Sequence, residues 1–103
     1  MNLGTLETLV VKWAEDRNLI EGSDPKSQFC KLVSEVGELG DNIGKNRIEA
    51  TKDDVGDCLV VLIILAQQMG YDLSEALSVA YNDIKDRKGK MVNGVFIKEE
   101  DVG

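Results

Sequence analysis

The amino-acid sequence predicts an all-α protein with a four-helix bundle-like fold that ends in a short C-terminal β-hairpin and assembles as an oligomer. Apolar residues recur at spacings of three and four along most of the chain, as is typical of amphipathic helices. The stretch Cys58–Ala66 is apolar on every side, so its helix must be surrounded, at the centre of a bundle, in a subunit interface or both. A length of 103 residues fits a single domain, residues 1–103, with a modest core that a dimer or tetramer would enlarge.

The first two helices are predicted from apolar spacing and from a strong start motif. Apolar residues predict a helix over Leu3–Arg17, followed by a loop from Asn18 to Pro25. Asp24 is expected to cap the second helix, with Pro25 in its first turn, because Asp accepts from free backbone N–H groups and proline has none to offer. This helix is expected to end near residues 44–46.

The third helix is predicted from about Lys52 to Met69. Thr51 and Asp54 resemble a capping box at its start, and Gly70 is a natural residue for its C-terminal cap. A fourth helix is expected to start at Asp72 or Ser74 and to run to about Ile84.

The C-terminal segment predicts a small β-hairpin. Residues 91–97 place apolar residues on both sides of Asn93–Gly94, a pair that favours a two-residue hairpin turn. An isolated hairpin is marginally stable, so this one needs a surface on which to pack.

Charge and composition exclude several classes of function. The net charge of −7 argues against a nucleic-acid partner, because binding to phosphate backbones requires excess Lys and Arg. The sequence contains no histidine, which excludes imidazole as a base or metal ligand. Cys30 and Cys58 lack zinc-type spacing and are expected to be buried, reduced thiols of a cytoplasmic protein. No signal sequence is expected, and the longest apolar run is about half of a membrane span, so no membrane partner is expected.

Two acidic pairs form the candidate site. Glu35 and Glu38 are three positions apart on the second helix, and Asp54 and Asp57 are three apart on the third. Each pair therefore shares one helical face, and antiparallel helices would place both pairs within roughly 6 Å of the same height. Four converging carboxylates require cations, and oxygen ligands favour Mg²⁺ or Mn²⁺. The alternative is that these pairs belong to ordinary solvated faces, since Asp and Glu make up 19 of the residues.

Glycines interrupt the same two helices. Gly37 lies between the two Glu residues and Gly56 between the two Asp residues, and Gly40 and Gly44 follow on the second helix. Glycine in a helix interior costs about 1 kcal/mol relative to alanine, so we expect a compensating close approach of the backbones.

With these motifs in view, the sequence resembles the MazG-like nucleotide pyrophosphohydrolases, and in particular their short, single-domain members, including those encoded by phages. The family has Glu-x-x-Glu on one helix and Glu-x-x-Asp on the next. The stretches SEVGELGDNIG and DDVGDCLVVLIILAQ match Glu35, Glu38 and Asp57 directly, whereas Asp54 stands where the family usually has Glu. The likeness covers about residues 10–98.

The resemblance implies a metal-dependent nucleoside triphosphate pyrophosphohydrolase that releases a nucleoside monophosphate and pyrophosphate. Mg²⁺, or Mn²⁺ in its place, would be bound by the four carboxylates, with Glu38 as the preferred residue to orient or deprotonate the attacking water. The resemblance also implies a group of side chains that contact the phosphates, from this subunit or a neighbouring one: Lys31, Asn82, Lys85 and Arg87.

Each of these assignments has a simpler alternative. Lys31 is four positions from Glu35 and could simply pair with it, and Lys85 and Arg87 lie in a charged run typical of a solvated helix end. For the whole chain, the alternative function is a non-catalytic helical module that binds nucleotide or metal, which the shorter Asp54 favours. A purely structural helical oligomer with an acidic surface is a third interpretation.

Overall fold

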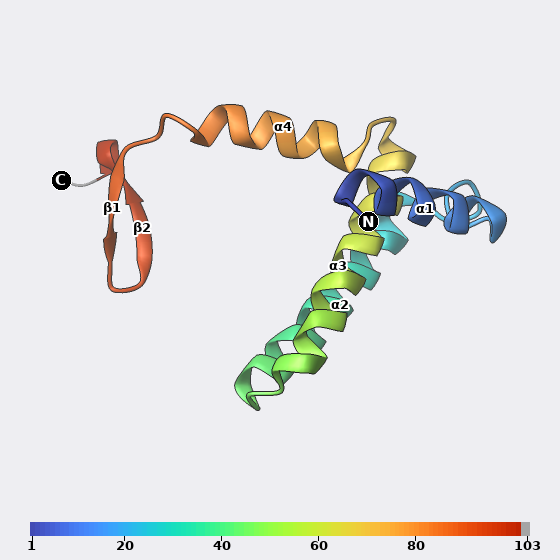
Figure 1. Ribbon diagram of the computed structural model, residues 1–103, viewed down its shortest axis with the longest axis horizontal. Coiled ribbons are helices and arrows are strands. Elements are labelled where there is room, and N and C mark those ends of the chain that lie inside the picture. The colour runs from blue at the N-terminus through green and yellow to red at the C-terminus, as the bar shows by residue number, and fades with distance from the viewer. Residues whose placement is uncertain (102–103) are drawn as a thin grey trace.

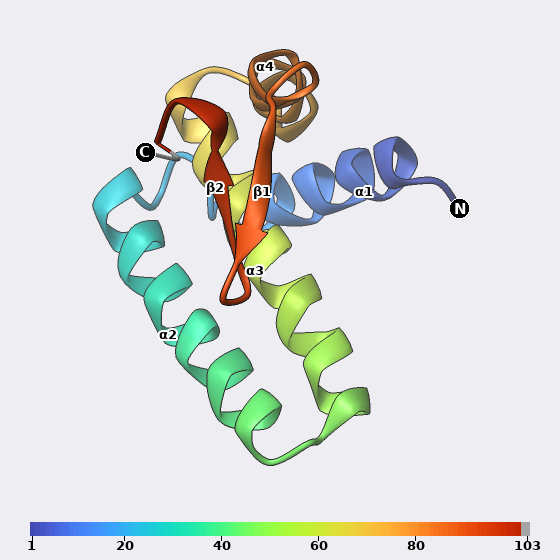
Figure 2. The ribbon, with the colours of Figure 1, turned by 90° about the vertical axis from the view of Figure 1, so that its left-hand side faces the viewer.

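The computed structural model describes residues 1–101 and contains four helices followed by a two-stranded hairpin (Figure 1). Its longest elements, α2 (Pro25–Gly44) and α3 (Ile48–Met69), run antiparallel and side by side. Helix α1 (Leu3–Asp16) crosses the end of this pair, as both views show (Figures 1 and 2). The predicted all-α class, the helix count and the terminal hairpin are thus confirmed.

The start of α2 follows the local chemistry that the sequence predicted. The Asp24 side chain accepts a hydrogen bond of 2.7 Å from the backbone N–H of Ser27, and Pro25 occupies the first turn. Helix α3 ends at Gly70, whose φ of +90° is the left-handed conformation that favours glycine. Both predicted caps are confirmed.

The start of α3 differs from the prediction. The helix begins at Ile48, four residues before Lys52, because Asn46 adopts a positive φ of 55° and turns the chain within three residues of α2. Thr51 therefore lies within the first turn, where its hydroxyl donates 2.6 Å to the carbonyl of Ile48. The capping box predicted at Thr51 and Asp54 is wrong, and only three residues connect α2 to α3.

The core lies where α1 meets the C-terminal half of α3. Its buried apolar residues come from these two helices only: Ala14, Val61, Ile63, Ile64 and Ala66. The expectation of two buried cysteines is wrong for Cys30, which is exposed on α2, while Cys58 on α3 is half-buried. The nearly all-apolar half of α3 is thus covered by its own chain only in part.

Helix α4 (Leu73–Ile84) does not complete a four-helix bundle within one chain. The axes of α3 and α4 are bent by 96° at the residues between them, so α4 leads away from the α2–α3 pair (Figure 1). The hairpin follows at its far end, with β1 (Gly89–Val92) paired antiparallel to β2 (Val95–Lys98) around the predicted Asn93–Gly94 turn. A 3₁₀ turn, η1 (Glu99–Asp101), ends the described chain.

The helix-interior glycines do not lie at close contacts within the chain. A Cβ atom added at Gly37, Gly40, Gly44 or Gly56 would meet no atom within 4 Å outside the local helix. The expected close approach of α2 and α3 at these glycines is therefore wrong for a single chain.

Within residues 1–101, no single helix has the length and apolar character that crossing a membrane demands. The bent pair of α3 and α4 meets that test only when the two helices are taken together.

Candidate metal-binding and catalytic site

One polar stripe runs along the face of α2 that lies toward α3. Its residues, Lys31, Glu35, Glu38 and Asn42, are spaced by four, three and four positions, which keeps them on one side of the helix. Glu35 is only 7% exposed, whereas Glu38 and Lys31 are open to solvent. The stripe therefore carries one buried carboxylate flanked by exposed charged groups.

The opposing residues on α3 repeat this pattern of one buried and one more open carboxylate. Asp54 is 5% exposed, and Asp57, one turn further along, is half-buried. Glu35 and Asp54 are the two buried charged residues of the described chain. The interpretation of both acidic pairs as ordinary solvated faces is therefore wrong for these two positions.

Two polar contacts hold the buried carboxylates. Lys31 Nζ lies 3.1 Å from Glu35 Oε1, which confirms the expected ion pair one helical turn apart. Asn42 Nδ2 donates a hydrogen bond of 2.7 Å to Asp54 Oδ2 and thereby links α2 to α3. The second Glu35 oxygen, Oε2, is buried and has no hydrogen-bond partner.

The proton affinities of these side chains show that their charges act on one another. The negative charge of Glu35, followed by desolvation and the charge of Asp54, raises the pKa of the Glu38 carboxyl. Desolvation first, and then the charges of Asp53, Glu35 and Asp54, raises the pKa of Asp57. Carboxylates that raise one another's pKa values in this way lack sufficient positive charge nearby.

The chemistry of these side chains fits a hard divalent cation. A buried carboxylate oxygen without a partner is costly, and the one neighbouring ammonium belongs to Lys31, whose side chain is 61% exposed. Asp and Glu oxygens are the ligands that Mg²⁺ and Mn²⁺ prefer. In residues 1–101, however, no three Asp, Glu or Cys side chains are arranged to share one ion. Lys31 contacts Glu35 there, and Asn42 contacts Asp54.

The other predicted phosphate-contacting residues lie elsewhere. Asn82 is near the C-terminal end of α4, and Lys85 and Arg87 follow that end, away from the α2–α3 pair (Figure 1). Arg87 pairs with Asp83 at 2.7 Å, and Asn82 and Arg87 line an open hollow of about 550 Å³ together with acidic residues of η1. Five of the eight predicted site residues therefore lie on α2 and α3: Lys31, Glu35, Glu38, Asp54 and Asp57. The other three lie at the end of α4 or just after it, and a single chain does not bring them to these five.

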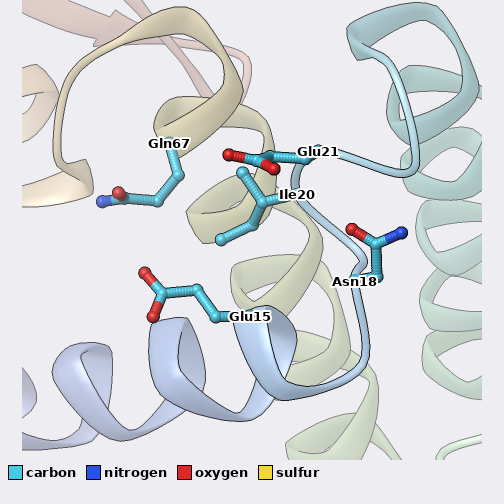
Figure 3. Close-up of a pocket in the computed structure, with 5 residues that line it drawn as sticks. All are labelled: Glu15, Asn18, Ile20, Glu21 and Gln67. Carbon is cyan, nitrogen blue, oxygen red and sulfur yellow. The ribbon is translucent and has the colours of Figure 1, made fainter.

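A separate pocket of about 280 Å³ lies between the end of α1, the following loop and the end of α3 (Figure 3). Its lining residues are Glu15, Asn18, Ile20, Glu21 and Gln67. Gln67 is ten residues beyond Asp57 on α3, about 15 Å along the helix. This pocket is therefore distinct from the carboxylate cluster.

The sequence interpretation missed two residues of the cluster. Asn42 could have been found by extending the spacing of Lys31, Glu35 and Glu38 by one further turn. Cys58 lies next to Asp57, and burial followed by the charges of Glu35, Asp54 and Asp57 raises the pKa of its thiol.

Comparison with known proteins identifies the family of this chain. The family model for the MazG nucleotide pyrophosphohydrolase domain matches residues 23–92, which include both acidic pairs. An uncharacterized 18.2 kDa protein in the rep-hol intergenic region of Haemophilus phage HP1 is 51% identical over 63 residues, which cover 61% of this chain and 39% of that protein. No solved structure matches the chain. The match to well over half of its length shows that this chain belongs to the MazG nucleotide pyrophosphohydrolase domain family.

Proposed function

We propose that this protein is a Mg²⁺-dependent nucleoside triphosphate pyrophosphohydrolase that cleaves ribo- or deoxyribonucleoside triphosphates to the monophosphate and pyrophosphate. The observation that carries the proposal is the pair of almost fully buried carboxylates, Glu35 and Asp54, at the interface of α2 and α3. A buried acidic pair without matching cations is destabilising unless a metal ion supplies the charge. Membership of the family supports the choice of reaction.

In this proposal Glu35, Glu38, Asp54 and Asp57 hold the metal, with Mn²⁺ as an alternative to Mg²⁺. The cation would supply neutralising charge to the triphosphate and would acidify the attacking water. Glu38 would orient that water or accept its proton, because its carboxylate is exposed to solvent on the face of α2 that carries the other site residues. Lys31 would contact a phosphate oxygen.

Asn82, Lys85 and Arg87 would contact the phosphates from a neighbouring subunit. Their position beyond α4, away from the carboxylates of the same chain, supports this arrangement. Exposed apolar side chains support a homo-oligomer, because α4 leaves Leu77 59%, Val79 71% and Tyr81 60% exposed. A dimer and a tetramer both satisfy this requirement. Since nucleoside triphosphates are intracellular, we propose a cytoplasmic location.

The test is to measure pyrophosphate and nucleoside monophosphate release from a panel of ribo- and deoxyribonucleoside triphosphates, with and without Mg²⁺. Pyrophosphate release that requires Mg²⁺ is expected, and Glu38→Gln should abolish it while the circular dichroism spectrum is retained. Glu49→Gln is the matched control, because Glu49 is an exposed glutamate at the start of α3. Release of inorganic phosphate would contradict the proposed bond. Absence of turnover, with Mg²⁺ still raising the melting temperature, would favour the non-catalytic module.

Subunit mixing tests the position of the α4 residues. Glu38→Gln lacks the carboxylate half of the site, and Arg87→Ala lacks part of the phosphate-contacting half. If each site combines two chains, co-refolding these two inactive variants should restore part of the activity. No recovery in proven mixed oligomers would place Arg87 outside a neighbour's site.

A further inference from the structure

Asn42 on α2 donates a side-chain hydrogen bond to Asp54 on α3. Within residues 1–101 its hydrogen bond to Asp54 is the only one between side chains that links α2 to α3. The acceptor must be the carboxylate, since an ionised Asp has no proton to donate, so the Asn42 amide presents its NH₂ group. The bond length of 2.7 Å is that of a charge-assisted hydrogen bond.

The partner of this amide, Asp54, is the most buried acidic residue of residues 1–101, and its short side chain has few alternative rotamers. Asp54 is 5% exposed, and an aspartate side chain is one methylene shorter than a glutamate. A buried carboxylate held by nothing would either rotate away from its neighbours or bind a proton. Asn42 donates to one of its two oxygens, Oδ2, and so restrains the rotation of the carboxylate.

A neutral donor suits this position better than a charged one. Lys31 compensates the charge of Glu35, and this compensation competes with any incoming cation. The Asn42 amide leaves the full negative charge on Asp54, so it can keep its contact when a cation binds. Hydrogen bonds of this kind to metal-ligating carboxylates orient the ligand, and their loss typically weakens metal binding by about 10- to 100-fold.

We propose that Asn42 is a positioning residue that orients the Asp54 carboxylate for binding of a divalent cation. This inference rests on the proposed function, because it takes the α2–α3 carboxylates as the metal site. In this role Asn42 acts through Asp54 and would contact neither the metal nor the substrate.

The test compares Asn42→Leu, which keeps the size of the side chain and removes the donor, with Asn42→Gln, which keeps the amide on a longer arm. Mg²⁺ affinity is measured without nucleotide, by calorimetric titration and by the Mg²⁺-induced rise in melting temperature. Asn42→Leu is expected to weaken Mg²⁺ binding about 10- to 100-fold, and Asn42→Gln to recover part of it. If Asn42→Leu folds poorly, Asn42→Ser, whose hydroxyl is too short to reach Asp54, gives the same comparison.

A double-mutant cycle separates positioning from general packing. In an Asp54→Asn background, Asn42→Leu should change Mg²⁺ affinity by less than about twofold, because its effect passes through Asp54. An equal loss in both backgrounds, or Mg²⁺ affinity of Asn42→Leu equal to that of the wild type, overturns the positioning role. A wild type that binds Mg²⁺ but releases no pyrophosphate overturns the proposed reaction alone. A wild type that binds no Mg²⁺ overturns both.

Discussion

Replacing Glu35 by Gln should stabilise the metal-free protein and remove its stabilisation by Mg²⁺. Glu35 is 7% exposed, its Oε2 atom has no partner, and its charge acts on both Glu38 and Asp57. An unsatisfied buried polar group costs about 1–3 kcal/mol, and more if it is charged. Gln removes the charge and offers an NH₂ group to the surrounding carboxylates, while the Lys31 side chain of the ion pair that is lost is 61% exposed.

We expect a net gain of about 1 kcal/mol in the free energy of unfolding in EDTA. For a domain of this size, that gain raises the melting temperature by about 4–8 °C. The wild type should gain about 2.7 kcal/mol when free Mg²⁺ is 100 times its dissociation constant. The order of stability therefore reverses: Glu35→Gln is the more stable protein in EDTA, and the wild type is the more stable in saturating Mg²⁺.

Thermal unfolding followed by circular dichroism, in EDTA and across a Mg²⁺ titration, measures both parts of this prediction. Glu49→Gln is the matched control, because the Glu49 side chain is 85% exposed and pairs with Lys52. Its melting temperature should change little in either condition. If Glu35→Gln were less stable than the wild type in EDTA, the reasoning that unpaired charge destabilises the metal-free site would be wrong.

Two further predictions concern pH and the end of α3. The raised pKa values of Glu38 and Asp57 mean that the folded, metal-free protein binds more protons than the unfolded chain, so these groups add stability as pH falls from neutral through the carboxyl range. Asp24, with its lowered pKa, acts in the opposite direction, so the check is a signed one: as pH falls, the unfolding free energy of Glu38→Gln in denaturant should rise less, or fall more, than that of the wild type. Gly70→Ala should lose about 1–2 kcal/mol of unfolding free energy, because φ is +90° there. No atom lies within 4 Å of the added Cβ, so the loss comes from the backbone conformation and not from a clash. Gly40→Ala, at an equally open position in the interior of α2, should instead gain up to about 1 kcal/mol by the same measurement.

The sequence was sufficient wherever short-range geometry decides the structure. The Asp24–Pro25 start, the Gly70 end and the Asn93–Gly94 turn each depend on the conformation of one or two residues, and all were predicted. The shared face of Glu35 and Glu38 follows from helical spacing alone. The start of α3 was not predicted because it depends on the positive φ of Asn46, a conformation that asparagine favours but does not always adopt.

Contacts between elements were less predictable. The direction of α4 depends on the bend after α3, which no spacing of apolar residues specifies. The hydrogen bond from Asn42 to Asp54 joins residues twelve positions apart across a turn, so it depends on the rotation of both helices. For the glycines of α2 and α3, the sequence pattern predicted a contact that the structure lacks. Their spacing suggested a close approach of the two helices, which α2 and α3 do not make.

Lys31 provides a last prediction, because it acts as the counter-charge of the metal-free site. The four carboxylates and this single ammonium leave a local charge of −3, from −4 and +1, and Lys31 Nζ lies 3.1 Å from a Glu35 oxygen. A bound cation would take over this role and free Lys31 for a phosphate. Lys31→Met should therefore tighten Mg²⁺ binding about two- to fivefold without nucleotide, a small effect because the side chain is 61% exposed, and should raise KM for the triphosphate. Lys45→Met, which breaks the exposed pair with Asp41 on the same helix, is the control and should change neither quantity. Weaker Mg²⁺ binding by Lys31→Met would show that the ammonium supports the metal site instead of competing with the metal for it.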